Sequence, residues 1–250
     1  YSDPGFIFDA KGSSCFASLE ILMPALGFLC SKISSHLLKG INPTIEFQTG
    51  NLSVLPFEKP DFNYSGWQKM TSISRSDWDL FETSWNFTTS PLLSREYHSK
   101  KLKETYYLLR TNWHDITNEM HRLEEANNKI FIDSYRLEEE LTPDIPIYEV
   151  TISCNPAYRY GQKVSKSVQE ERLLADTLKE FISYSVGCMF GRYSLEEPGL
   201  ILANKGETLE DYLKIVSNPS FIPDDDNIIP ILDLDWFEDD ITARFKKFLK

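Results

Sequence analysis

The sequence has 250 residues, and its 26 lysines and arginines against 38 aspartates and glutamates give a formal net charge of −12. Hydrophobic residues make up 41% of the chain, and there are only 11 glycines and 13 prolines. This composition excludes a disordered or fibrous chain, and the acidity argues against nucleic-acid binding over the whole surface. The longest apolar run, residues 21–30, contains a proline and is too short for a membrane span of about 20 residues.

Cysteine and histidine spacing gives no metal-site signal. The four cysteines lie far apart without a CxxC pair, and the four histidines show neither HxH nor HExxH spacing. A tetrahedral zinc site usually includes one closely spaced ligand pair, so we expect no metal site and free thiols in a reducing cytoplasm. No signal peptide precedes the fold and Tyr1 is not methionine, so we expect an excerpt of a longer cytoplasmic chain.

Residues 1–57 are expected to form a small α/β piece. The short apolar run at residues 5–8 precedes turn-forming residues and is typical of a strand. Apolar residues from 16 to 37 recur at spacings of three and four, which predicts one helix. Residues 45–55 alternate in polarity around a Gly-Asn pair, which predicts a hairpin or a bulged strand.

Residues 58–93 carry three of the five tryptophans. Ser76 precedes Trp78, Phe81 and Trp85, whose spacing predicts a short capped helix with these aromatic rings on one face. Packing into a core or an interface is the favoured interpretation. A base-stacking platform is the alternative, but no basic residues are interleaved with the rings.

Residues 94–142 carry the clearest pattern. Steps of four and three alternate without interruption through twelve positions, ten of them apolar: Leu102, Tyr106, Leu109, Trp113, Ile116, Met120, Leu123, Asn127, Ile130, Ser134, Leu137 and Leu141. This heptad seam predicts one long helix of about 70 Å, with Asn127 fixing the register at a cost in stability. Such a seam needs a partner, either from the same chain or from a second molecule.

Residues 143–250 are expected to be mainly helical. Residues 145–154 indicate a strand or an extended arm. Ser167 and Glu170 then predict a capping box ahead of a strong amphipathic helix. A shorter helix is expected over residues 208–216, and a last helix has acidic residues in its first turn and lysines in its last. The predicted fold class is therefore mainly α (α+β), with its β structure in the N-terminal piece.

Nucleotide and phosphate motifs such as GxGxxG and GxxxxGK[ST] are missing from the sequence. Asn155-Pro-Ala-Tyr158 resembles the Asn-Pro-Pro-Tyr motif of amino-methyltransferases, whose asparagine accepts hydrogen bonds from a flipped adenine while the tyrosine stacks on it. Here alanine replaces the second proline, and no glycine-rich turn for S-adenosylmethionine is evident. Asn155 and Tyr158 are thus the catalytic candidates, but an ordinary Asn-Pro turn with a packed tyrosine is favoured.

Two basic stretches are the candidates for DNA contact, with a solvated charged face as the alternative for each. The predicted DNA-binding residues are Arg95, Lys100, Lys101, Lys103, Arg159 and Lys163. An acidic stretch at residues 224–226 could hold a hard cation, but a solvated loop is favoured.

Several stretches of the sequence resemble parts of one family of enzymes. The region that closes the catalytic domain of type IIG adenine-specific DNA methyltransferases resembles residues 27–32 (GFLCSK), 37–45 (LLKGINPTI), 47–48 (FQ) and 50–56 (GNLSVLP). The helical spacer of those enzymes resembles residues 76–79 (SDWD), 81–85 (FETSW), 129–133 (KIFID) and 140–143 (ELTP). The stretches CNPAYRYG (154–161) and ISYSVGCMFGRY (182–193) narrow this resemblance to the PglX methyltransferases of bacteriophage-exclusion (BREX) systems.

The resemblance implies a large adenine-N6 methyltransferase that uses S-adenosylmethionine and acts on double-stranded DNA, with other BREX components as candidate partners. It divides the chain into the end of the catalytic α/β domain (1–57), a Trp-rich linker (58–93), a long spacer helix (94–142) and a helical region adjoining target recognition (143–250). The catalytic motif and the cofactor-binding turn of the family lie upstream of these stretches.

No catalytic, cofactor or metal residue is therefore carried over, and we expect the chain to be inactive alone, serving as spacer and DNA-facing scaffold. The alternative is a protein-interaction module that docks through the heptad seam onto another defence component or onto itself.

Overall fold

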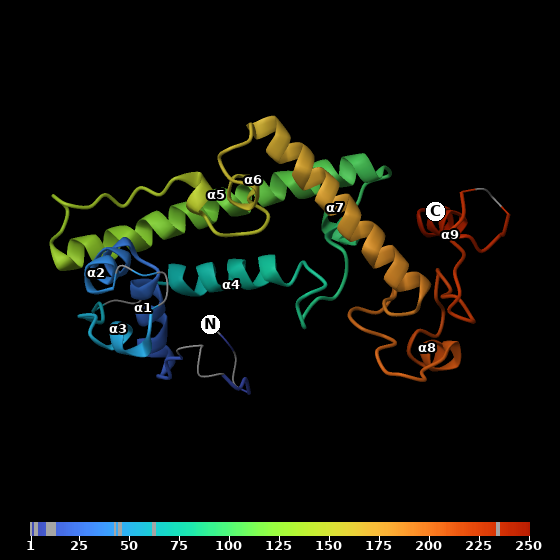
Figure 1. The fold of residues 1–250 in the computed structure, drawn as a ribbon, viewed down its shortest axis with the longest axis horizontal. Helices are drawn as coiled ribbons and strands as arrows, with labels where there is room; N and C mark the ends of the chain where they lie inside the picture. The colour runs from blue at the N-terminus through green and yellow to red at the C-terminus, as the bar shows by residue number, and fades with distance from the viewer. Residues whose placement is uncertain are drawn as a thin grey trace. The chain divides into compact units, whose positions relative to one another are not determined.

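The structure is a computed structural model that describes residues 2, 5–8, 14–42, 44, 47–61, 64–233 and 236–250. These residues are mainly helical and include no strand, which confirms a mainly α fold class (Figure 1). The expected β structure near the N-terminus is not observed: residues 5–8 are not a strand, and Thr49–Ser53 form helix α3. Ile45, in the predicted hairpin, lies outside the described residues.

The chain divides into two compact units. Unit 1 comprises Tyr1–Arg75 and His114–Tyr158, and unit 2 comprises Ser76–Trp113 and Arg159–Lys250. Both units are discontinuous in sequence, because the longest helix contributes its first part to unit 2 and the remainder to unit 1. The four-part division expected from the sequence stays a prediction.

The elements follow one another in a simple order. Unit 1 contains α1 (Leu19–Leu29), α2 (Lys32–Ile41), α3 (Thr49–Ser53), most of α4 (Gly66–Trp78), the second part of α5 (Leu102–Tyr135), the 3-10 turn η3 (Ile147–Glu149) and the start of α6 (Pro156–Tyr160). Unit 2 contains the 3-10 turns η1 (Pro91–Leu93) and η2 (Arg95–Tyr97), the first part of α5, α7 (Lys166–Met189), α8 (Leu209–Ile215) and α9 (Ile241–Phe248).

The single helix expected between residues 16 and 37 is instead two helices, α1 and α2, with a bend of 69° between them. Ser31 causes a local stop and restart, because its hydroxyl donates to the Phe28 carbonyl at 2.7 Å and accepts from the Ser34 amide at 3.4 Å. Across the described ranges, no single helix has the length and apolarity to cross a membrane; only the bent pair α1–α2 reaches them, by length and composition alone.

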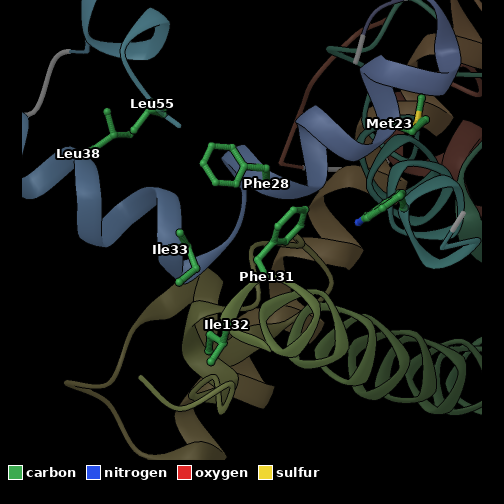
Figure 2. Packing of buried hydrophobic residues seen from close by; sticks show 8 residues of the cluster. Met23, Phe28, Ile33, Leu38, Leu55, Phe131 and Ile132 are labelled. Carbon is green, nitrogen blue, oxygen red and sulfur yellow. The ribbon is translucent and has the colours of Figure 1, made fainter. Parts of the chain in front are cut away.

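The core of unit 1 lies where α1 and α2 pack on the second part of α5. The rings of Phe28 and Phe131 lie close together in an edge-to-face arrangement, with centroids 5.6 Å apart (Figure 2). Ile33 and Leu38 extend this cluster from α2, and Trp67 joins it from α4. Large apolar side chains from four helices are therefore buried together, which is the main stabilising contribution to this unit.

The core of unit 2 is aromatic and lies at the C-terminal end of α7. Tyr184 and Tyr193 stack with centroids 5.0 Å apart, and Phe87 packs edge-on against Tyr193 at 5.4 Å. After α7 the chain reverses direction and places Tyr193 against the helix, which requires glycine at two positions. Gly191 follows the end of α7 with φ +70°, and a Cβ on Gly187 would lie 2.5 Å from the Tyr193 ring.

Helix α5 is shorter than the predicted range 94–142. On its N-terminal side, residues 91–97 form the two 3-10 turns, and α5 begins only at Leu102. At its C-terminal end Arg136 adopts φ +57°, with hydrogen bonds from the Arg136 amide to the Asp133 carbonyl (3.2 Å) and from the Leu137 amide to the Ile132 carbonyl (3.1 Å). This Schellman arrangement ends the helix without glycine or proline, a stop that the sequence did not indicate.

The partner of the heptad seam lies within the chain. Half of the twelve seam side chains are buried: Tyr106, Leu109, Trp113, Met120, Leu123 and Asn127. Leu137 and Leu141 lie beyond the helix and pack against the unit 1 core. The buried part of the seam is thus covered by intramolecular packing, so docking through the seam gains no support from this structure.

The prediction of a short helix with Trp78, Phe81 and Trp85 on one face is wrong. Helix α4 ends at Trp78, and Phe81 and Trp85 follow in turns. Trp85 is fully exposed at 101% and Trp78 at 60%, whereas Trp67 is buried in unit 1. The Asp79 carboxylate accepts a 2.5 Å hydrogen bond from the Ser84 hydroxyl and holds the chain in a turn there instead of a helix.

The C-terminal helices are close to those predicted. Helix α7 begins two residues earlier than expected, because Ser165 and not Ser167 is its N-cap. Helix α8 has a capping box formed by Thr208 and Asp211. Helix α9 begins after Asp240, whose side chain accepts from the Thr242 amide at 2.8 Å, so the acidic residues expected in its first turn precede the helix. The lysines lie in its last turn, as predicted. Residues 145–154 form a non-strand arm containing η3.

Candidate nucleic-acid interface

The first basic cluster lies at the entrance to α5. Arg95 is in η2, while Lys100, Lys101 and Lys103 surround the start of the long helix, and all four side chains are exposed. The local fold is set by Ser99, whose amide donates to the Thr105 hydroxyl at 3.1 Å and whose hydroxyl donates to Glu104 at 2.6 Å. Lysines beside a helix N-terminus reinforce the positive end of the helix dipole, which favours an anion there.

The cations of this cluster are only weakly engaged. Lys101 pairs with Glu104 at 3.4 Å, and both side chains are well exposed. Lys103 lies 5.9 Å from the centroid of the Tyr107 ring. Arg95 and Lys100 form no ion pair with any described residue. Exposed pairs of this kind contribute little to stability, so phosphate groups could displace them at low cost.

Tyr107 is a residue that the sequence motifs did not indicate. It is exposed on α5 one turn after Lys103, and its ring lies below that ammonium group. The i, i+4 spacing of a lysine and an aromatic residue on one helix face was the signal that could have found it. A flat ring beside cations can stack on a sugar or a base as well as on a lysine.

Arg110 has a structural role beside this cluster. Its guanidinium donates twice to the Glu170 carboxylate, with both distances 2.7 Å, so α7 is fastened to the first part of α5. A bidentate, partly buried pair of this geometry is far stronger than the exposed lysine contacts. Glu170 was expected in a capping box with Ser167, but its carboxylate binds Arg110 instead.

The second basic stretch is divided by the fold. Arg159 donates to Glu180 at 2.9 Å, lies 3.5 Å from Asp176, and its guanidinium is 5.4 Å from the centroid of the Phe81 ring. Lys163 is exposed in the connection between α6 and α7. A phosphate at Arg159 would have to compete with two carboxylates, whereas Lys163 has no such competitor among the described residues.

Asn155 is a structural residue of the turn before α6. Its side-chain amide donates to the carbonyls of Ile147 (2.7 Å) and Val150 (2.9 Å), and its oxygen accepts from the Ala157 amide at 3.1 Å. Only 2% of the residue is exposed. Both donors are therefore used by backbone, and the buried oxygen is already bonded, which does not fit the capture of a flipped adenine.

Tyr158 on α6 is 45% exposed, so the packed tyrosine favoured from the sequence is not observed. No glycine-rich strand-to-helix turn exists in the described ranges, which contain no strand. Asn155 and Tyr158 therefore do not fit a site for S-adenosylmethionine and a flipped adenine.

Comparison with known proteins identifies the chain's relatives. No family model matches the chain. The adenine-specific methyltransferase PglX of Lacticaseibacillus casei (strain Zhang) is 36% identical over 260 residues, a match that covers the whole chain. The resemblance to PglX is confirmed. The adenine-specific methyltransferase BrxX of Escherichia coli O9:H4 (strain HS) is 32% identical over 257 residues, again covering the whole chain.

The chain spans only about a fifth of these relatives, 20% of PglX and 21% of BrxX. It is thus similar to one segment of PglX, and the relatives' names describe proteins about five times as long.

Proposed function

We propose that the chain is a segment of a DNA adenine-N6 methyltransferase of a BREX phage-exclusion system, serving as a helical spacer and a DNA-facing scaffold. The observation that carries this proposal is the similarity to PglX and BrxX along the entire chain. Methyl transfer from S-adenosylmethionine belongs, in this proposal, to parts of the enzyme outside this segment, because Asn155 and Tyr158 do not provide a catalytic site.

The spacer role is supported by α5. Its 34 residues extend for about 50 Å at 1.5 Å per residue. Buried side chains occur along most of its length, including Leu109 in unit 2 and Phe131 in unit 1. One continuous, well-packed helix is a stiff element, as a spacer within a larger enzyme requires.

The DNA-facing role is supported by the cluster at the start of α5. Lys100, Lys101 and Lys103 are exposed and held only by weak contacts in a chain that is acidic overall. Lysines without a planar recognition partner contact phosphates and not base edges, so we expect binding that is independent of sequence and sensitive to salt.

The test is a titration of the chain with duplex DNA across a salt series. The variant Lys100→Gln, Lys101→Gln, Lys103→Gln should bind more weakly at low salt. The slope of log K against log salt should fall by roughly 1 for each phosphate that the variant no longer binds. Fluorescence anisotropy of a labelled duplex measures both the affinity and the slope.

The matched control removes the same charge elsewhere. Lys39→Gln, Lys59→Gln, Lys205→Gln changes three other exposed lysines and should leave the slope unchanged. Equal losses of affinity in both triple variants would mean that net charge alone governs binding. No binding at low salt would remove DNA contact from the proposal while leaving the spacer role.

A further inference from the structure

The segment from residue 224 to 240, here called the acidic loop, is fixed at both ends. Asp224 is buried and paired with Arg244 of α9. Asp240 is also buried, and its carboxylate accepts from the amides of Thr242 (2.8 Å) and Leu232 (3.2 Å). Two buried and bonded carboxylates thus hold the two ends of the loop in place.

Large apolar side chains project from this loop. Ile231 is 77% exposed and Trp236 72%, and Ile228 and Phe237 are also exposed. Only Leu234 and Asp235 of the loop lie outside the described residues. Exposed apolar side chains gathered in one short segment mark interaction sites, since water contact with them is unfavourable and burial against a partner removes it.

The same loop is uniformly negative. Residues 224–240 include eight carboxylates, and no lysine, arginine or histidine occurs from residue 215 to 243. Beyond Asp224, which pairs with Arg244, none of the acidic residues that the structure describes in the loop makes an ion pair with a described residue. Asp225, Asp226 and Glu238 are exposed, so their mutual repulsion is relieved only by cations from outside the loop.

Several classes of ligand are disfavoured by these observations. The carboxylates of Asp224, Asp225 and Asp226 lie close enough to share a cation, but Arg244 already neutralises the buried member. Nucleic acid and anionic membranes carry the same sign of charge as the loop and would be repelled. What remains is a surface that combines positive charge with apolar groups.

We propose that the acidic loop is a docking site for a cationic, amphipathic segment of a partner protein. Trp236 and Phe237 would be buried against the apolar face of that segment, while its lysines and arginines meet Asp225, Asp226 and Glu238. Aromatic anchors surrounded by complementary charge are the usual composition of such interfaces. The proposal does not depend on the DNA contact proposed above. The acidic loop and the lysine cluster at α5 are separate segments of opposite charge, so they would bind different partners.

The experiment measures binding of three synthetic helical peptides of about 18 residues to the whole chain. The probe has leucines on one face and lysines on the other; one control has glutamates in place of the lysines, and another has serines in place of the leucines. We expect salt-sensitive binding of the lysine–leucine peptide. The affinity of either control peptide should be at least about tenfold lower. Similar binding of all three peptides would overturn the proposal.

Variants locate the binding site on the loop. Asp225→Asn, Asp226→Asn, Glu238→Gln and, separately, Trp236→Ser, Phe237→Ser should each weaken binding of the lysine–leucine peptide by about tenfold. Matched controls are Glu138→Gln, Glu139→Gln, Glu140→Gln, three exposed carboxylates outside the loop, and Trp85→Ser, a tryptophan that is more exposed than Trp236. All of these changes are at exposed positions, so the thermal transition should remain that of the parent chain.

Two results would overturn the assignment. Peptide affinity that is unchanged in both loop variants would place binding elsewhere. Equal losses of affinity in the loop variants and in their matched controls would show that the peptide binds to exposed acidic or apolar side chains in general and not to this loop.

Discussion

Asn127 connects three elements of unit 1 through one buried amide. Its oxygen accepts from the Trp67 indole N–H at 2.7 Å, and its nitrogen donates to the Gly27 carbonyl at 2.9 Å. The sequence placed a polar residue on the heptad seam and predicted a role in register. The tertiary structure adds the reason, because this side chain joins α5 to both α1 and α4.

Removing this amide should be costly. Asn127→Ala leaves the Trp67 N–H and the Gly27 C=O buried without partners, and we expect a loss of about 2–4 kcal/mol in the free energy of unfolding. Urea denaturation followed by circular dichroism measures it. Asn118→Ala, an exposed asparagine on the same helix, is the control and should change stability little. A loss no larger than that of the control would contradict the role given to Asn127.

Glu124 is a source of pH dependence in unit 1. Burial raises its pKa to about 7, while the charge of nearby His121 acts in the opposite direction. A folded-state pKa above the unfolded value means that the folded state binds the proton more tightly. This contribution to stability is therefore full below the unfolded pKa and is lost as pH rises through about 7.

Replacing this carboxyl group by an amide removes the titration. Glu124→Gln should raise the melting temperature at pH 8, where the parent chain must bury a charged carboxylate, and change it little at pH 5. Thermal melts at the two pH values test this prediction, with Glu138→Gln, an exposed position, as the comparison. The same gain at both pH values would rule out titration as the cause.

Two helical glycines show how packing decides the effect of one methyl group. A Cβ on Gly187 would lie 2.5 Å from the Tyr193 ring, whereas a Cβ on Gly40 would meet nothing within 4 Å. We expect Gly187→Ala to destabilise the chain by about 1–3 kcal/mol through displacement of the ring. Gly40→Ala, exposed in α2, should stabilise it by about 0.5–1 kcal/mol through helix propensity.

Chemical denaturation measures the free energy of unfolding of the two glycine variants. We expect it to fall for Gly187→Ala and to rise for Gly40→Ala. Matching changes in midpoint would indicate that the Tyr193 ring moves aside without cost. Helical spacing within α7 does not reveal this contact, because Tyr193 reaches Gly187 only after the chain reverses at Gly191.

The element boundaries show which signals are local. The capping residues of α8 and α9 act within one turn of their own helices, and both helices were predicted closely. The end of α5 at Arg136 was not predicted. The left-handed arginine there is accompanied by packing of Leu137 against the unit 1 core, a tertiary contact that the local sequence does not show. The break at Ser31 was missed for a similar reason, since apolar spacing continues across it.

At the scale of the whole molecule, the two units share one helix and neither is contiguous in sequence. A fragment ending at Tyr158 keeps all of unit 1 but removes α7, α8 and α9 from unit 2. We expect residues 120–132 of this fragment to stay protected from hydrogen exchange, and residues 102–113 to lose protection because their packing partners are gone. Protection of both segments would mean that α5 is stable without α7.

The sequence alone determined the mainly α class, the helices α7, α8 and α9, the position of the exposed lysines and the likeness to PglX. These follow from local periodicity, from charge placement and from stretches long enough to be specific. The tertiary structure decided that the heptad seam is covered within the chain, that Arg159 is held by Asp176 and Glu180, and that Asn155 serves a backbone turn. A side chain's partners depend on which distant segments pack together, and periodicity within one segment carries no information about that choice.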